Sequence, residues 1–241
     1  MNYSIRHFQS HAEYAELEML MTRIWGSGTE VASPIAIAID HHDGCVLGAF
    51  ENESGRLLGG VMSFLRFSNH PGASRGLAQH SHIAGVLPEA QGHGIGEALK
   101  RAQAEFVRGQ GLNLITWTYD PIEARNAWLN IGKLRCVCRT FIENLYGLME
   151  DELNRGLPSD RFEVEWWLDD ARPRPDINGP YVEVEIPSNF QAMKKMNMDK
   201  AWSLRMALRE RFQSLFADGF AVFEFIPDRE RPRYGLWRVR D

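Results

Sequence analysis

Three glycines at alternating positions, Gly92, Gly94 and Gly96, are the residues whose types and spacing point most directly to chemistry. An apolar stretch that ends at Val86 precedes them, and a helical pattern begins at Ile95. A turn from a strand into a helix leaves the first N–H groups of the helix unpaired, and the helix dipole adds partial positive charge there. Since glycine has no Cβ to block a close approach, this segment predicts a binding site for phosphate or pyrophosphate.

Two familiar phosphate-binding turns do not match these glycines. The dinucleotide fingerprint requires G-x-G-x-x-G, with an acidic residue at the end of the next strand about 20 residues on. Here the spacing is G-x-G-x-G, and the next strand-like segment, 114–119, ends at Asp120, which is too far along. The P-loop requires a Gly-Lys-Ser/Thr sequence, which this chain lacks. An ordinary glycine-rich turn between a strand and a helix stays as an alternative.

The segment from Gln91 to Gly96 resembles a third turn, the (Gln/Arg)-x-x-Gly-x-(Gly/Ala) motif of the GCN5-related N-acetyltransferases, known as the GNAT superfamily. It matches at every specified position, and the preceding Val86-Leu87-Pro88 is similar to the strand end found there. Further segments resemble a poorly characterised subgroup of predicted acetyltransferases with a C-terminal extension, namely 118–121, 125–127, 144–147 and 156–161. The superfamily resemblance covers roughly residues 3 to 145.

This resemblance implies an α/β (α+β) fold with a mixed, mostly antiparallel central sheet, flanking helices, and strands splayed apart at the cofactor site. The predicted strands are 3–8, 45–51, 56–67, 80–86, 114–119 and 136–142, and helices are predicted at 10–25, from 33, from 95 and at 121–134. We expect residues 1–168 to form the acyl-CoA-binding catalytic core. Residues 169–241 are expected to form a strand-helix-hairpin extension that packs on the core or on a partner subunit.

The resemblance also implies acetyl-CoA or another acyl-CoA as the co-substrate. Its pyrophosphate is expected on the backbone N–H groups of the glycine turn, and its pantetheine arm along the strand before the turn. Asn126 resembles an asparagine that often binds the pantetheine, and His93 is predicted to lie beside the phosphates or in solvent. The expected cofactor-binding residues are Ala84, Gly85, Val86, Gln91, Gly92, His93, Gly94, Ile95, Gly96, Glu97 and Asn126.

His80 and His82 are the candidates for the base that takes a proton from the attacking amine. Strand alternation predicts that both lie on one face together with Ala84 and Val86. An imidazole titrates near neutral pH and therefore suits this task. Superfamily members with a base on this strand place it about where His80 falls. The alternative is a pair of strand histidines that bond their neighbours or face solvent.

The acid that protonates the departing thiolate is harder to locate. Many superfamily members place a tyrosine in the helix after the splayed strand, just before a Gly-Phe pair. That position falls near Ile131 here, and the Gly-Phe pair is missing. Tyr119 and Tyr146 are the predicted substitutes, although packing is the commoner role of a tyrosine.

The resemblance leads to a functional hypothesis: an acyl-CoA-dependent N-acyltransferase. A primary amine of a small molecule, such as an amino acid, would attack the thioester directly. Two alternatives stay open, a protein acetyltransferase and a CoA-binding sensor module without turnover. The sensor alternative stays because the tyrosine that many superfamily members place in this helix is absent here. The expected partner is the small-molecule amine, and a homodimer is the other assembly considered.

Composition narrows the classes further. The formal net charge of −5 disfavours a general nucleic-acid-binding protein, which needs a basic face. No apolar run approaches the length of a membrane span, and no signal region precedes the first strand, so no membrane partner is expected. Three cysteines, Cys45, Cys136 and Cys138, favour a reducing, cytoplasmic compartment. Their spacing does not predict a metal site.

Overall fold

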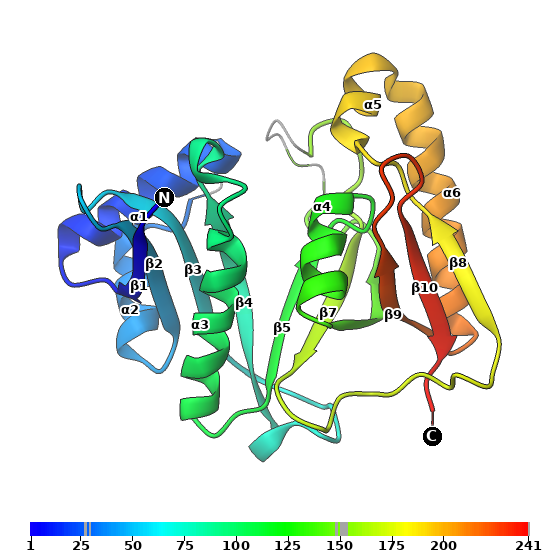
Figure 1. Ribbon diagram of the computed structural model, residues 1–241, viewed down its shortest axis with the longest axis horizontal. Helices are drawn as coiled ribbons and strands as arrows, with labels where there is room; N and C mark the ends of the chain where they lie inside the picture. Colours follow the sequence, from blue (N-terminus) through cyan, green and yellow to red (C-terminus); the bar gives the residue numbers. More distant parts are fainter. Residues whose placement is uncertain (27, 29, 148, 150–153, 241) are drawn as a thin grey trace. The chain divides into compact units, whose positions relative to one another are not determined.

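The computed structural model of the protein describes residues 1–26, 28, 30–147, 149 and 154–240. Its contacts divide the chain into two compact units, residues 1–116 (unit 1) and 117–241 (unit 2). Figure 1 shows the helices and strands of both units along the chain. Nearly all neighbouring strands run antiparallel and helices flank them, which confirms the predicted α/β class with a mostly antiparallel sheet.

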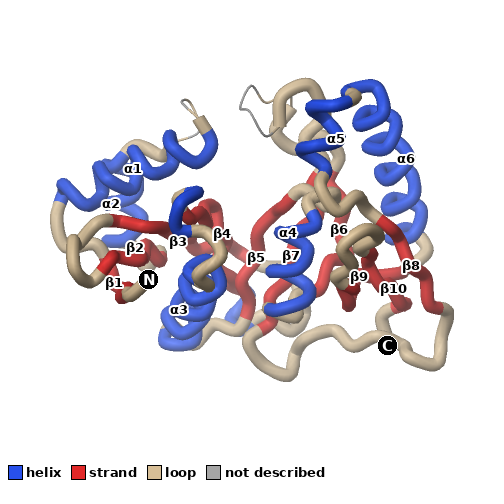
Figure 2. The backbone as a smooth tube through the Cα atoms, turned by 45° about the horizontal axis from the view of Figure 1, so that its top comes forward, coloured by secondary structure: helices blue, strands red, loops and turns tan. Residues whose placement is uncertain are grey.

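Unit 1 is a sheet with helices on both faces. Its strands, in hydrogen-bonded order, are β1 (Tyr3–His7), β2 (Cys45–Glu51), β3 (Leu57–Phe67), β4 (Leu77–Val86) and the start of β5 (Leu114–Tyr119). Its helices are α1 (His11–Trp25), α2 (Ser33–His41) and α3 (Ile95–Gly109), with short 3-10 turns at Ser74–Gly76 and Pro88–Ala90. A Cβ on Gly60 would meet Leu17 of α1, whereas one on Gly59 would meet Leu99 of α3. Because neighbouring strand residues point to opposite faces, α1 and α3 cover opposite faces of this sheet, as Figure 2 shows.

Strand β4 contains a bulge at His82. Met62 of β3 pairs with Ile83, and Ser63 pairs with Ser81, so His82 has no register partner on β3. The Ser81 hydroxyl accepts a hydrogen bond from α3, and Val86 also lies on the α3 side, next to the position of a Cβ on Gly59. Residues five apart share a face only if an extra residue interrupts the alternation. The bulge therefore places Ala84 and Val86 on the face opposite His80, which corrects the expectation that all four share one face.

Unit 2 also contains a sheet flanked by helices. Its strands, in hydrogen-bonded order, are the end of β5, β7 (Arg161–Trp167), β6 (Val137–Ile142), β9 (Phe220–Ile226), β10 (Arg233–Arg238) and β8 (Tyr181–Glu185). Its helices are α4 (Ala124–Ala127), α5 (Phe190–Met196) and α6 (Met198–Ala217). Figure 1 shows α6 running behind the strands of this sheet.

Aromatic side chains form the core of unit 2 between the sheet and α6. The ring of Phe162 on β7 lies 4.7 Å from that of Phe212 on α6 and 5.6 Å from that of Tyr234 on β10. Each of these three side chains is fully buried. The strands and the helix after residue 169 thus share their core with β6 and β7. The predicted functional division at residue 168 differs from the division into compact units at residue 116, and it stays a prediction.

The segment after β5 folds differently from the single helix predicted at 121–134. A short helix, α4, is followed by a π-helical turn at Trp128–Lys133. In this turn the Leu134 N–H donates to the Leu129 carbonyl, five residues back. The Ile122 N–H donates to the Asp120 carboxylate, which delays the start of the helix. Helical periodicity does not separate these two forms, since both keep apolar side chains on one face.

Several properties concern the described residues as a whole. Within them, none of the helices combines the length and the hydrophobicity that a membrane span requires. The same residues contain no cluster of three or more histidine, cysteine or acidic side chains arranged to hold a metal ion. Cys45, Cys136 and Cys138 are buried and form no disulfide bond among the described residues, and burial raises the pKa of Cys45 to about 12.

Candidate functional site

The glycine turn leads directly into α3, as predicted. Gly92 and Gly94 both have positive φ, +85° and +78°, which an L side chain rarely adopts. A Cβ on either glycine would meet no heavy atom of the described residues within 4 Å, so the turn is open at its surface. Gly94 is also the N-cap residue of α3, and no described side chain caps this helix. Its first N–H groups are therefore available for an anion, and the open turn fits a pyrophosphate.

Hydrogen bonds hold the turn to β4. The Gln91 amide donates to the Val86 carbonyl at 3.1 Å, so the glutamine of the motif ties the strand end to the turn. The Nδ1 atom of His93 lies 3.1 Å from the Gln91 carbonyl, which can only accept. His93 therefore carries a proton on Nδ1, and its exposed ring lies along the turn. Glu97, in the first turn of α3, pairs with Arg101 at 2.8 Å.

The edge of β4 next to the turn is suited to an extended ligand. On one side, Ala84, Gly85 and Val86 pair with β3. On the other side, the ladder to β5 includes only Gln79 and His80 among the described residues. The backbone of residues 84–86 therefore has one edge without a strand partner in the described residues. An extended chain with amide groups, such as a pantetheine arm, can pair with such an edge.

His80 and His82 lie together on the face of β4 that carries Phe64 of β3. The ring centroid of Phe64 is 5.4 Å from that of His80 and 6.2 Å from that of His82. The His80 Nδ1 atom is 3.3 Å from the Thr116 hydroxyl of β5, and Arg66 donates to the same hydroxyl at 3.4 Å. His80 is half-buried, whereas His82, at the bulge, is exposed.

The surroundings keep both histidines neutral. Burial, followed by the charges of Arg66, His82 and Lys100, lowers the pKa of His80 to about 4. The pKa of His82 is also lowered, because the surrounding protein replaces part of its water even though its side chain is exposed. At neutral pH each imidazole therefore has a lone pair that can accept a proton, which is the state that a general base requires.

The predicted tyrosines and Asn126 belong to unit 2, where they differ in exposure. Tyr119 is buried, and its hydroxyl lies 3.0 Å from that of Tyr234, which donates to the Pro121 carbonyl. Burial raises the pKa of Tyr119 well above its ordinary value. Tyr146 is about half exposed, at 49%, and its hydroxyl lies 3.1 Å from that of Thr118. Asn126 is exposed on α4. Tyr119 thus has a packing role in unit 2, and Tyr146 keeps an accessible ring.

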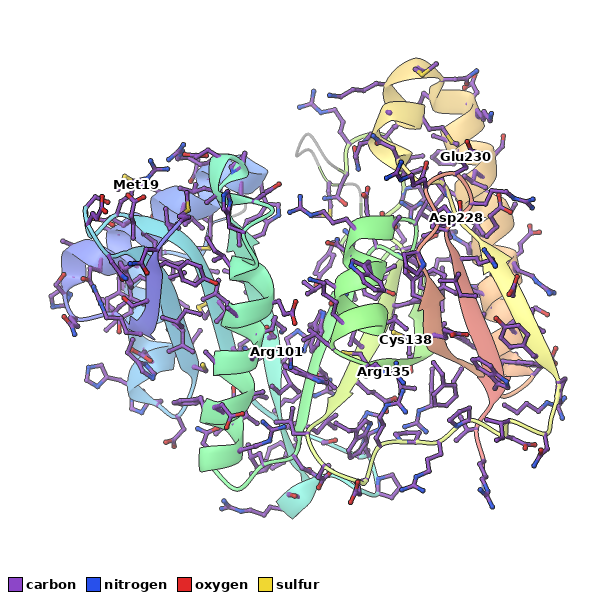
Figure 3. All side chains as sticks on the ribbon, viewed as in Figure 1. Met19, Arg101, Arg135, Cys138, Asp228 and Glu230 are labelled. Atoms are coloured by element: carbon purple, nitrogen blue, oxygen red, sulfur yellow. The ribbon has the colours of Figure 1, made fainter. Side chains whose placement is uncertain are left out.

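Sequence reasoning did not identify several residues that surround this site. Phe64, Arg66 and Thr116 contact the histidines only because strands distant in sequence pair in register. Lys100 was also missed, although its position gives a signal: it lies beside Leu99 on the side of α3 that faces the sheet. Figure 3 labels its neighbour Arg101 on α3. A charged residue on the apolar stripe of a helix indicates a buried polar contact.

Comparisons with known proteins agree with this geometry. Residues 8–128, half of the chain, match the model of the acetyltransferase (GNAT) family. No curated protein matches the chain. Among solved structures, the NatC complex bound to Gag peptide and CoA is similar over 70% of this chain and all of its own, with a TM-score of 0.56 and 14% identity.

Two further structures show how varied these relatives are. The ribosomal-protein-S18-alanine N-acetyltransferase of Escherichia coli is 11% identical, with a TM-score of 0.54 over 70% of this chain and 95% of its own. A mosquito arylalkylamine N-acetyltransferase (like 5b) is 13% identical, with a TM-score of 0.51 over 69% of this chain and all of its own. At these identities the likeness shows a shared fold, and it leaves the acceptor open.

Proposed function

Because the chain belongs to the acetyltransferase (GNAT) family, we propose that it transfers an acyl group from acyl-CoA to a primary amine of a small molecule. The observation that carries the proposal is the open glycine turn at the uncapped start of α3. Its N–H groups, from Gly92 to Glu97, are the donors for the pyrophosphate. Acyl-CoA, the co-substrate, supplies the activated thioester, and the amine attacks its carbonyl carbon.

The histidine pair on β4 supplies the proton acceptor. An amine must lose a proton as it forms the new C–N bond, and a neutral imidazole can take that proton. If His80 donates its Nδ1 proton to Thr116, its Nε2 lone pair is left to accept one. His82 has the more exposed ring, so the amine reaches it more easily. Phe64 lies beside both histidine rings. Its apolar side chain favours the uncharged form of a substrate amine that approaches these rings.

The departing thiolate needs a proton in the same reaction. The sequence predicts Tyr119 or Tyr146 as its donor, and of these two side chains Tyr146 has an exposed ring, whereas the Tyr119 hydroxyl is buried and bonds Tyr234, which donates to the Pro121 carbonyl. The protein then releases free CoA and the amide. The lowered pKa values of the histidines keep the acceptor uncharged through the neutral range.

A matrix of acyl-CoA donors and amines tests this function. Free thiol is measured for acetyl- and succinyl-CoA against amino acids, arylalkylamines and peptides with free N-termini. The proposal expects thiol release with at least one small amine, and a mass increase of that amine equal to the acyl group. Release with peptides only would assign a protein acetyltransferase instead. CoA binding without thiol release for any acceptor would indicate a binding module.

A further inference from the structure

A buried lysine joins α3 to β4 next to the bulge. The Lys100 ammonium donates to the Ser81 hydroxyl at 3.0 Å and to the Gln103 amide oxygen at 2.8 Å. The Gln103 amide nitrogen donates to the same Ser81 hydroxyl at 3.2 Å, which closes a ring of three side chains. All three are buried, and Lys100 is only 2% exposed. A charge in such a place is costly unless its hydrogen bonds are well made, so the ring holds its members in fixed positions.

The location of this ring connects it to the proposed site. Ser81 lies between His80 and His82, and it is the last residue in register with β3 before the bulge. Lys100 lies on α3, six residues after Gly94 of the turn. Helix α3 therefore contacts β4 at Ser81, directly before His82, which is the residue that departs from regular pairing. A bulge changes the direction in which the side chains of its strand point, so a contact that fixes the residue beside the bulge also fixes that direction.

We propose that Lys100, acting through Ser81, is a positioning residue that holds the bulge of β4 so that His80 and His82 keep their shared face. This inference rests on the proposed function for its catalytic meaning. Lys100 acts from the α3 face of the sheet, and the histidines face the other way. It therefore touches neither the acyl donor nor the amine, and its effect passes through the strand.

The charge of Lys100 gives a second, measurable effect. It is one of the groups that lower the pKa of His80, together with Arg66 from β3 and His82 on the same strand. Thr116 is the neighbour on β5, and α1 approaches β4 at Gly85 with the uncharged side chains of Ile24 and Trp25. Removing the Lys100 charge should therefore raise the pKa of His80. Removing only the Ser81 hydroxyl keeps the charge and changes the geometry.

The test compares Lys100→Met, Ser81→Ala and their combination with Arg108→Met. Arg108 is an exposed cation on α3 that pairs with Glu105, so this control removes the same charge from the same helix. NMR titration of the His80 and His82 rings is carried out on the full chain without acyl-CoA. Single His→Gln variants assign the resonances. Steady-state kinetics then give kcat and KM separately, and calorimetry gives the CoA affinity.

The proposal expects Lys100→Met to raise the His80 pKa and to change the ring shifts of both histidines. It expects kcat to fall on the order of tenfold to a hundredfold, the scale of a misplaced catalytic group, with CoA affinity nearly unchanged. Ser81→Ala should shift the same resonances, and the combined variant should be no slower than the worse single one. The proposal would be overturned if Lys100→Met and Ser81→Ala both showed the same histidine ring shifts and the same kcat as Arg108→Met. If the wild type acylates no amine, the proposed function fails, and the NMR comparison still decides whether Lys100 positions the histidines.

Discussion

Each unit contains one long helix with a buried cation, and the groups that these two cations contact differ. In unit 1, Lys100 of α3 donates to the neutral groups of Ser81 and Gln103. In unit 2, Arg205 of α6 makes a two-pronged pair with the Asp120 carboxylate, at 2.8 and 2.5 Å. A guanidinium fork on a carboxylate fixes geometry and neutralises both charges. The charge of Lys100 also acts on the histidines, because it adds to burial, Arg66 and His82 in lowering the pKa of His80.

The starts of the same two helices differ in a related way. Helix α6 begins at Asn197, whose side chain accepts a hydrogen bond from the Lys200 N–H. Helix α3 begins at Gly94 without a side-chain cap from the described residues. A side-chain cap accepts a hydrogen bond from a backbone N–H group at the start of a helix, whereas an uncapped start leaves these N–H groups for water or a ligand. This contrast favours a ligand-binding role for the start of α3 and a purely structural start for α6.

The largest expected effect is on stability and concerns Arg205. Replacing it by methionine leaves the Asp120 carboxylate in the protein without its closest cation, which should cost about 3–5 kcal/mol of the free energy of unfolding. Denaturant unfolding measures this, with the exposed Arg211→Met on the same helix as the control. Adding Asp120→Asn should recover part of the loss, since the amide oxygen can still accept from Ile122. A loss no larger than that of the control would contradict a stabilising role for this pair.

The next effect is on rate and concerns the histidines. Loss of the proton acceptor should lower kcat on the order of a hundredfold or more in His80→Ala or His82→Ala, with CoA affinity nearly intact. The unfolding free energy should change much less than in Arg205→Met, because His82 is exposed and His80 is only half-buried. Full activity in both variants would mean that water or another residue takes the proton.

A smaller but clear effect is expected at the turn. Gly94→Asp places a carboxylate against the pyrophosphate and should weaken CoA binding by at least about 2 kcal/mol, the scale of an uncompensated buried charge. Gly111→Asp is the matched control, because Gly111 also has positive φ, at +73°, and open space around its Cβ position. It lies just after the C-terminal end of α3. Equal CoA affinities in the two variants would exclude the turn as the pyrophosphate site.

The pH dependence of the rate distinguishes the two histidines. The neutral ring is the active form, so kcat/KM should fall as the pH drops through the pKa of the acceptor. For His80 this acid limb should lie near pH 4, and for His82 it should lie below the ordinary value of 6.5. Arg66→Met removes a charge that lowers the His80 pKa, so a limb due to His80 should move to higher pH. A limb that does not move would point to His82.

The turn could be predicted from sequence because its signal is local. Glycines at fixed spacing, a preceding proline and a following amphipathic stripe set backbone conformation within about ten residues of one another. The family match and the mostly antiparallel sheet followed from the same signal and are confirmed. The strand limits agree to within a few residues, with β6 beginning at Val137 instead of residue 136.

The bulge at His82 could not be predicted, because it depends on how β4 aligns with β3. One extra residue reverses the faces of Ala84 and Val86, which alternation alone placed with the histidines. The burial of Tyr119 likewise depends on Tyr234, 115 residues away in sequence. The π-helical turn after α4 depends on its packing, since its composition is that of an ordinary helix. These features all arise from contacts between distant segments.

Calorimetry of CoA, NAD and ATP binding to the unmodified chain tests the central claim most directly, that the open turn of α3 is an acyl-CoA site. The account predicts that CoA binds at least an order of magnitude more tightly than NAD or ATP, since the turn departs from both of their motifs. It also predicts that CoA competes with acetyl-CoA. Binding of NAD or ATP as tight as that of CoA, or no measurable binding of CoA, would contradict the account.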